Sequence, residues 1–240
     1  MMSHQNWSLS RNIIHAILHG VSRNYDLTPI GGGNSVDVFH DGFTVLSPDG
    51  EKLFTWDTSA TVDPVNDKYL NTLDTYYDLV HANSVSWDAA GDYYFTLNNL
   101  NELWKIDGKT GDVLYRVGDN GNIAIPADAH TSGIHSSVPL APDKVLVLDN
   151  GSKSGTSRAL VYDIDASAKT ASVSLSVPIP SSLSSTDRSN CELLEDQGLI
   201  FFGSTAGRCC LFTDMDGNIR KVIRRSGISY RTHYFSTIEY

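Results

Sequence analysis

The chain has 240 residues, of which 40% are hydrophobic and 19% are charged. This composition is typical of a globular protein with a sizeable core and excludes a disordered or fibrous chain. The formal net charge of −10 gives no electrostatic reason to expect nucleic acid or an anionic membrane as a partner. We predict a single domain over residues 1–240, in which an anionic substrate would need local positive charge at its site.

The apolar stretch near the start of the chain is too short for a membrane span. It runs from Ile13 to Leu18 and contains His15, whereas crossing a bilayer takes about 20 apolar residues. We recognise no signal peptide, because no basic segment is followed by a long apolar region and a small-residue cleavage site. The pattern over Asn12–Leu18 predicts a short helix.

One plan recurs along the chain: a polar start, an alternating strand, a turn with Asp or Gly, and a further strand. It first appears in Phe39–Asp57, which contains a Pro-Asp-Gly turn. His81–Leu97 repeats it, and Glu102–Asp107 and Asp112–Val117 complete a set of four short strands. Asp-Gly pairs supply the positive φ angles of two-residue turns, so these strands are predicted to pair as antiparallel hairpins.

The second half of the chain repeats this plan twice more. His135–Leu148 starts the third unit and Asn190–Phe202 starts the fourth. With the first two starts at His40 and His81 and a weaker start near Thr232, the spacings are 41, 54, 55 and 42 residues. Propeller blades span roughly 40–50 residues plus loop insertions, so the spacing is that of blades.

We therefore predict an all-β fold, a β-propeller with four-stranded antiparallel blades, five or six in number. A β-sandwich also has short strands joined by regular turns, but the repeated order of polar start, strand and turn disfavours it. Residues 1–34 are a candidate segment for closing the ring. Gly118–His130 and Pro178–Ser189 are predicted to be long connections between blades.

The cysteines do not form a disulfide framework. Cys191, Cys209 and Cys210 allow one bridge at most, and no C-x-x-C spacing occurs. Cysteine commonly behaves as a small hydrophobic residue, so we predict buried thiols rather than a redox or metal role.

The polar starts of the repeats form the candidate site. The first strand of each blade lines the central channel of a propeller, so residues at equivalent starts converge. These starts hold three histidines and two asparagines: His40, His81, Asn83, His135 and Asn190. One such residue alone would be a cap on neighbouring backbone, whereas three matching histidines favour a functional cluster.

Two chemistries suit such a cluster. A zinc centre of three histidines is one, but no ligand pair has the short local spacing that holds a metal, and we expect none. Asn83 beside His81 instead suits hydrogen bonding to the oxygens of a transferring sulfuryl or phosphoryl group.

Several stretches resemble the aryl-sulfate sulfotransferase family. His81–Val85 is similar to its H-x-N-S motif, and Lys105–Asp107 and Gly111–Gly118 follow like its K-I-D strand and its G-x-I-x-W-x-L-G strand. Ile134–Ser136 and Asp149–Gly151 are similar to its Q-H-D segment and its F-D-N-G strand.

The resemblance implies an activity and roles for the candidate residues. With Phe39–Asp41, which is similar to an upstream H-D-x strand, it covers about residues 36 to 165. It implies a six-bladed enzyme that moves a sulfuryl group from an aryl sulfate donor to a phenol acceptor, with no nucleotide donor and no cofactor. His135 would be the nucleophile that becomes a sulfohistidine, assisted by His81 and His40. The substrate-binding residues would be Asn83, Asn98 and Asn190.

The chain departs from the family pattern at two places. Asn98 stands where the family has an arginine in an S-x-R context. Arg158 and Arg231 are the candidates to supply the missing cation from a neighbouring blade, although a surface position suits Arg158 better. The segment around His135 lacks the Gln and Asp of the Q-H-D motif, and His130 is a candidate substitute for the orienting partner, although an exposed loop position suits it better.

Two other functions stay open at this point. One is a non-catalytic propeller that binds a small aromatic, a sulfated ligand or a protein partner, which Asn98 favours. The other is a metal-dependent hydrolase or lyase that uses the same histidines. The resemblance implies a periplasmic or secreted location, and a cytoplasmic one stays open because no signal peptide is recognised. The oligomeric state is not indicated.

Overall fold

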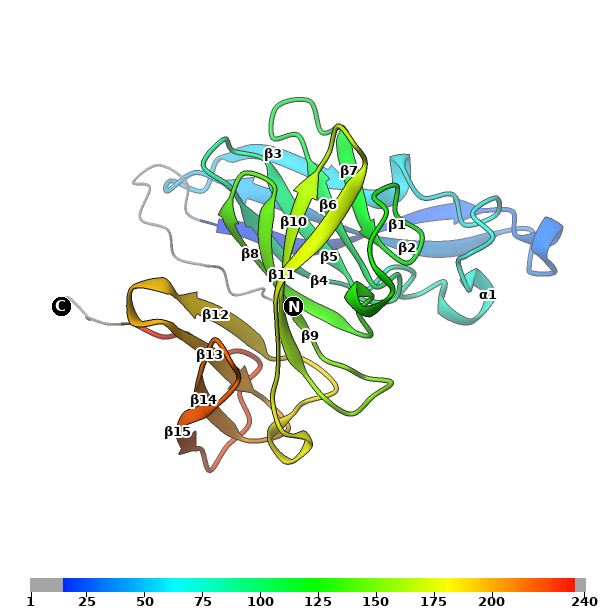
Figure 1. Ribbon diagram of the computed structural model, residues 1–240. Helices are drawn as coiled ribbons and strands as arrows, with labels where there is room; N and C mark the ends of the chain where they lie inside the picture. Colours follow the sequence, from blue (N-terminus) through cyan, green and yellow to red (C-terminus); the bar gives the residue numbers. More distant parts are fainter. Residues whose placement is uncertain (1–14, 236–240) are drawn as a thin grey trace.

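The computed structural model describes residues 15–235, and these residues form four antiparallel sheets (Figure 1). The first sheet contains β1 (His15–Tyr25), β2 (Val36–Leu46) and β3 (Lys52–Asp57). The second contains β4 (Ala82–Trp87), β5 (Tyr93–Leu97), β6 (Glu102–Ile106) and β7 (Val113–Gly118). The third contains β8 (Ile134–Ala141), β9 (Lys144–Asp149), β10 (Arg158–Asp165) and β11 (Thr170–Pro178). The fourth contains β12 (Asn190–Leu194), β13 (Leu199–Ser204), β14 (Cys209–Asp214) and β15 (Ile219–Arg224).

Among residues 15–235, helical structure is confined to short turns in the connections. They are α1 (Thr72–Thr75) and the 3₁₀ turns Thr28–Ile30, Thr58–Ala60, Ala127–Ala129, Ser181–Leu183 and Glu195–Gln197. In the part of the chain that the structure describes, no helix is both long and apolar enough to cross a bilayer.

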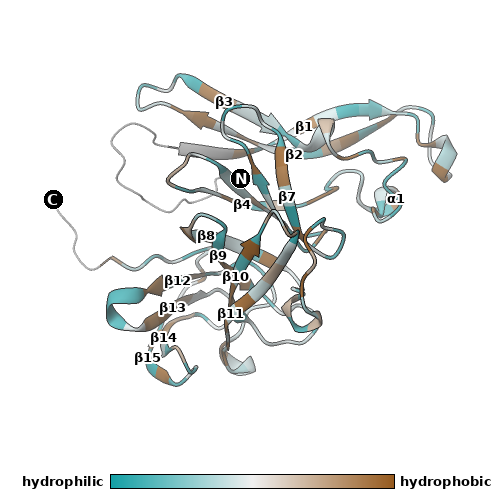
Figure 2. Cartoon of the chain, turned by 45° about the horizontal axis from the view of Figure 1, so that its top comes forward, coloured by the Kyte–Doolittle hydropathy of each residue, from teal (hydrophilic) through white to brown (hydrophobic). Residues whose placement is uncertain are grey.

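Consecutive strands pair within each sheet, and the sheets follow one another as the blades of a β-propeller (Figure 1). β4, β8 and β12 are the first strands of their blades, and β8 lies against both of the others. Hydrophobic segments fall largely in the strands (Figure 2). The prediction of four-stranded antiparallel blades is confirmed for the second, third and fourth blades, which also start where the repeats indicated, whereas the first sheet has three strands among the described residues. The number of blades stays a prediction.

The first blade differs from the prediction. His15–Tyr25 is a strand that pairs with β2 along its whole length, from His15 opposite Leu46 to Tyr25 opposite Val36. The predicted helix is therefore wrong for residues 15–18, and residues 12–14 lie outside the described part. Backbone hydrogen bonds to a full-length partner strand outweigh a weak local helix pattern. Ring closure by residues 1–34 stays a prediction.

Aromatic side chains fill the space between the first two blades. The ring centroids of Phe43 and Phe95 lie 5.4 Å apart, and those of Trp56 and Trp104 lie 6.3 Å apart in an edge-to-face arrangement. Trp56 Nε1 also donates a hydrogen bond of 2.8 Å to the carbonyl of Gly111. Two further hydrophobic clusters include residues of the second and third blades and of the third and fourth blades. The three cysteines are buried and free, as predicted.

A buried carboxylate fixes the outer part of the second blade. Glu102 on β6 is inaccessible to solvent, and Arg116 on β7 donates to its two oxygens at 2.9 and 3.1 Å. Trp104 Nε1 and the Asn120 amide donate to the same carboxylate. The guanidinium lies over the Trp104 ring, 4.5 Å from its centroid. Both oxygens of the Glu102 carboxylate therefore have hydrogen-bond donors and a counter-charge, which makes the buried charge tolerable.

Replacing Arg116 with Met should lower the free energy of unfolding by about 3–5 kcal/mol, because Glu102 would stay buried without its counter-charge. Urea denaturation measures the change. The matched control is Arg220→Met, which removes a surface ion pair to Asp214 from a side chain that is 59% exposed. The control should change stability by less than about 1 kcal/mol. Equal effects of the two substitutions would contradict the role given to Arg116.

Candidate functional site

Three of the predicted site residues lie where consecutive blades begin. His81 directly precedes β4, His135 is the second residue of β8, and Asn190 is the first residue of β12. His40 is different, because it lies in the middle of β2 rather than at the start of a blade.

The side chain of His40 makes its polar contacts inside the first blade. It is fully buried, with Nε2 3.0 Å from the Tyr25 hydroxyl and Nδ1 3.4 Å from the Thr58 hydroxyl. Burial lowers the pKa of the His40 imidazole. Neighbouring residues of a strand point to opposite faces, so Asp41 faces the cavity described below and His40 does not. The structure thus does not bring His40 together with His81 and His135, as an equivalent blade start would have done.

His135 is buried beneath the segment that follows β15. Its exposed fraction is 3%, and its Nε2 lies 3.2 Å from the hydroxyl of Tyr230. The two rings are tilted by 53° with centroids 5.3 Å apart. Burial, followed by the nearby charge of Arg231, lowers the pKa of His135 well below its usual range. The imidazole is therefore neutral near pH 7, as a nucleophile requires.

Arg231 supplies positive charge next to His135. Its Nη2 donates to the carbonyl oxygens of Asn83 at 2.6 Å and of His135 at 2.7 Å, and lies 3.4 Å from the His135 Nδ1. The two carbonyl contacts are the shorter ones and account for both Nη2 hydrogens, so the contact to Nδ1 is the weakest of the three. Desolvation lowers the pKa of Arg231 to about 10, and the guanidinium stays charged near neutral pH.

A cavity of about 390 Å³ opens beside this group. Its lining comes from the first two blades, from the loop that follows α1 and from the segment after β15: Leu18, His19, Gly20, Asp41, Tyr77, Asp78, His81, Ala82, Asn83 and Tyr230. Pockets for small ligands usually span about 300–1,000 Å³, so the cavity suits one aromatic ring with its substituents. Tyr230 lines the cavity and contacts His135, which is not itself among the residues that line the cavity.

His81 is held at the cavity wall by a carboxylate. Its backbone has a φ of 51°, which is uncommon for a residue other than glycine and often marks a functional position. Its Nδ1 lies 2.6 Å from a carboxylate oxygen of Asp78, which leaves Nε2 for a ligand. Asp41 lies nearby and accepts a hydrogen bond of 2.9 Å from the Ala82 amide. Burial raises the pKa of Asp41.

The three predicted asparagines connect parts of the chain. Asn83 and Asn98 both donate to the carbonyl of Ile134, at 3.0 and 3.1 Å, and so link the second blade to the third. Asn190 donates to the Thr232 carbonyl at 2.9 Å and accepts from the Thr232 amide at 3.0 Å. Of the three, Asn83 alone lines the 390 Å³ cavity.

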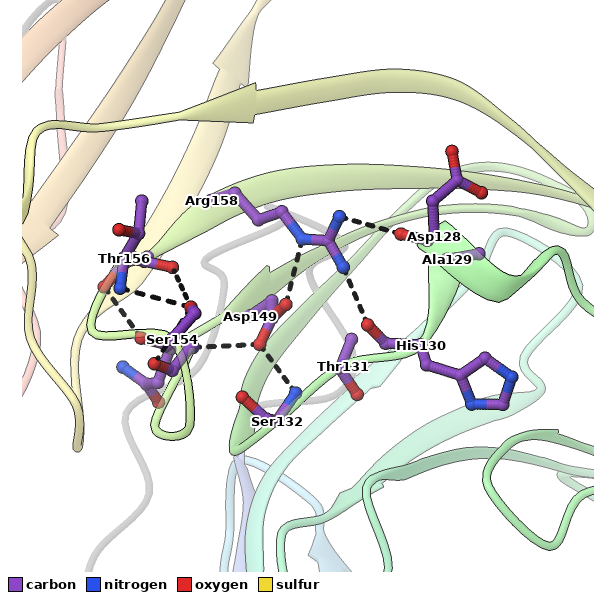
Figure 3. A network of polar contacts seen from close by, with 12 residues as sticks. Asp128, Ala129, His130, Thr131, Ser132, Asp149, Ser154, Thr156 and Arg158 are labelled. Carbon is purple, nitrogen blue, oxygen red and sulfur yellow. Dashed lines mark hydrogen bonds and ion pairs between the residues drawn. The ribbon is translucent and has the colours of Figure 1, made fainter.

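Arg158 and His130 make contacts within the third blade and the loop before it, away from the cavity lining (Figure 3). The Arg158 guanidinium pairs with Asp149 at 2.9 Å and donates to the carbonyls of Asp128 and His130 at 2.8 and 2.7 Å. His130 itself is exposed, as predicted, and its Nδ1 lies 2.7 Å from an Asp119 carboxylate oxygen. Of the two arginines considered from the sequence, Arg231 is the one beside His135.

Sequence reasoning did not single out Tyr230, His19, Asp41 or Asp78. The weak repeat start near Thr232 was the available signal for Tyr230, because the hydrogen bonds between Asn190 and Thr232 bring that start into the site. Among residues 15–235 there is no group of three or more His, Cys, Asp or Glu side chains placed to hold a metal ion.

Comparisons with known proteins agree with this architecture. A family model described as arylsulfotransferase (ASST) matches residues 12–225. A protein of unknown function from Bacteroides caccae has 11% identity and a TM-score of 0.50, over 81% of this chain and 58% of that chain. At this identity the likeness shows the fold alone. The chain spans less than two thirds of the length of that structure. No curated protein matches the present chain.

Two other solved structures are similar over much of the chain. Kluyvelomyces marxianus Hsv2 has 10% identity and a TM-score of 0.31, over 81% of this chain and 62% of that one. Virginiamycin B lyase from Staphylococcus aureus has 11% identity and a TM-score of 0.34, over 88% of this chain and 74% of that one. These scores are too low to carry an argument.

Replacing His135 with Asn should weaken the pH dependence of stability. The pKa of His135 is lowered in the folded chain, so the unfolded chain binds a proton at this residue at a higher pH than the folded chain. The stability that neutral His135 contributes is complete above the unfolded pKa of about 6.5 and declines below it. Denaturation at about pH 7 and about pH 5 should show a smaller loss in the variant. His130→Asn is the exposed control, and a loss in His135→Asn equal to that of the wild type would contradict the argument.

Proposed function

The chain belongs to the arylsulfotransferase family, and on this premise we propose that it transfers a sulfuryl group from an aryl sulfate ester to a phenol through a sulfohistidine at His135. The observation that carries the proposal is the setting of His135. A neutral imidazole has its Nε2 3.2 Å from a phenol oxygen, and a guanidinium lies beside the same residue. This combination of groups suits sulfuryl transfer to and from phenols.

The first step forms the covalent intermediate. An aryl sulfate enters the cavity, Tyr230 moves aside, and the Nε2 lone pair of His135 attacks sulfur. The N–S bond forms while the bond between sulfur and the aryl oxygen breaks, and the electron pair of that bond leaves with the phenolate. His81 donates a proton to the phenolate from Nε2, while Asp78 holds its Nδ1.

The second step reverses these roles. A phenol in the cavity gives its proton to His81, and its oxygen attacks sulfur while the N–S bond breaks and the electron pair returns to His135. Arg231 holds the His135 carbonyl and keeps positive charge near the transferring anion, in a protein whose net charge is −10. Asn83 at the cavity wall orients the substrate, whereas Asn98 and Asn190 support the strands behind it.

The burial of His135 favours a second candidate function. With an exposed fraction of 3%, His135 does not meet solvent until Tyr230 moves. A propeller that binds a small aromatic, a sulfated ligand or a protein partner without turnover would need no such movement. Turnover assays separate the two functions.

A periplasmic or secreted location also belongs to the proposal, because family members are typically exported.

Replacing His135 with Ala should abolish transfer. Incubation with a chromogenic nitrophenyl sulfate and a phenol should release nitrophenol and form the sulfated acceptor, and the variant rate should fall by at least about a thousandfold because no nucleophile remains. His130→Ala, which alters an exposed imidazole on Asp119, should keep the wild-type rate. Aryl sulfate binding without any turnover in the wild type would reject the catalytic function and support the binding function.

Replacing Arg231 with Met should lower kcat/KM by about ten- to a hundredfold, the effect of losing a charge-assisted contact of about 1.5–3 kcal/mol. Arg231→Lys keeps the charge but not the planar guanidinium that places one nitrogen between the two carbonyls, so its kcat/KM should lie between those of Arg231→Met and the wild type. Thermal melts of all three proteins would separate loss of folding from loss of rate. An unchanged kcat/KM in folded Arg231→Met would remove Arg231 from the mechanism.

A further inference from the structure

The phenol of Tyr230 lies in the position of a sulfuryl acceptor. Its oxygen is 3.2 Å from the Nε2 of His135. A partner hydrogen-bonded to an imidazole nitrogen lies near the direction of that nitrogen's lone pair, which is also the direction in which an N–S bond would form. A sulfuryl group on Nε2 would therefore point toward the Tyr230 oxygen once the phenol has drawn back, because the present 3.2 Å leaves no room for sulfur between the two atoms. That oxygen would face sulfur from the side opposite the departing nitrogen.

The backbone around Tyr230 is fixed while its side chain borders open space. The Tyr230 carbonyl accepts hydrogen bonds from the Ser189 amide at 3.0 Å and from the Thr205 hydroxyl at 3.2 Å. The next residue, Arg231, is bound to the Asn83 and His135 carbonyls. The phenol ring is only partly buried and lines the 390 Å³ cavity. It can move into the cavity to admit a donor and return to His135 without displacement of its backbone.

We propose that Tyr230 is a site of self-sulfation, at which the chain transfers the sulfuryl group of its own sulfohistidine to a tyrosine when no external phenol is present. This inference rests on the proposed function. The Tyr230 oxygen attacks sulfur and forms an O–S bond, the N–S bond breaks, and its electron pair returns to Nε2 of His135. The phenol proton passes to His81, which lines the same cavity. No redox change and no further reactant are required.

The surroundings of Tyr230 set the balance between self-sulfation and transfer to an added phenol. Burial raises the pKa of the Tyr230 hydroxyl, so attack needs a base to take the proton. The charged and titratable groups acting on Tyr230 include Arg231, Arg188 and Asp187. An external phenol in the cavity reaches the same sulfur and the same His81, and so competes with Tyr230. Self-sulfation should therefore decline as the acceptor concentration rises.

The test is peptide mass spectrometry of the full chain after incubation with nitrophenyl sulfate, with and without added phenol. Without phenol, we expect the peptide that contains Tyr230 to carry one added SO₃ group. The group should stay after a brief mild-acid treatment that removes sulfuryl groups from imidazole. Added phenol should reduce the label on Tyr230 and yield sulfated phenol instead.

Three variants complete the test. Tyr230→Phe should lose the acid-resistant label, and His135→Ala should lose it as well, because the group arrives through the imidazole. Tyr234→Phe is the matched control in the same segment, since its hydroxyl contacts Gln197 rather than His135, and it should keep the label on Tyr230. A label on Tyr230 that persists in His135→Ala would overturn the inference.

The inference and the proposed function can fail separately. If sulfated phenol forms but Tyr230 stays unlabelled when phenol is absent, self-sulfation is wrong and the transferase function stands. If nitrophenyl sulfate yields neither sulfated phenol nor a labelled peptide, the proposed function fails, and the inference fails with it.

Discussion

One guanidinium joins three parts of the molecule that are far apart in the sequence. Arg231, in the segment after β15, donates from a single nitrogen to the carbonyls of Asn83 on β4 and of His135 on β8. A charge taken out of water is costly unless it is hydrogen-bonded, and desolvation lowers the pKa of Arg231 to about 10. The two carbonyl contacts offset that cost. They also fix the adjacent Tyr230 against His135, so the geometry of the candidate site depends on this one side chain.

The first strands of the blades carry buried polar side chains, and this imposes a second constraint. Their donors and acceptors must form hydrogen bonds with one another. Asn83 and Asn98 share the Ile134 carbonyl, and the hydroxyls of Ser86 and Ser137 lie 3.0 Å apart across the gap between the second and third blades. Buried polar groups that are matched in this way hold neighbouring blades in register. Hydrophobic clusters farther along the strands supply most of the burial. Polar side chains that border open space lie at the cavity, where the strands begin, and also in a smaller pocket between the first strands, which Ser136 and Asn190 line.

The blades could be predicted from the sequence because their signals are local. Alternating strands and Asp-Gly turns recur at blade spacing, and His81, His135 and Asn190 do begin their blades. The error at His40 has a physical cause: an unexpected strand, β1, pairs with β2, so His40 lies mid-strand and faces Tyr25 and Thr58. The contact between Tyr230 and His135 spans 95 residues and comes from a segment without a strand. No local pattern encodes such a contact.

The position of Tyr230 over His135 also affects how a sulfuryl group on this histidine would be kept from water. A sulfuryl group on an imidazole can pass to water as well as to a phenol, so a site that favours phenols has to exclude solvent while the intermediate exists. His135 is 3% exposed, and the side chain that lies over its Nε2 is itself a phenol. An acceptor that takes the place of Tyr230 at this nitrogen fills the same space best when it has a ring of similar size and a hydroxyl. A phenol meets both demands, whereas a water molecule leaves most of the aromatic space unfilled. The proposed preference for aromatic acceptors would then depend on the shape of the space that Tyr230 fills over His135 as much as on the chemistry of the nucleophile.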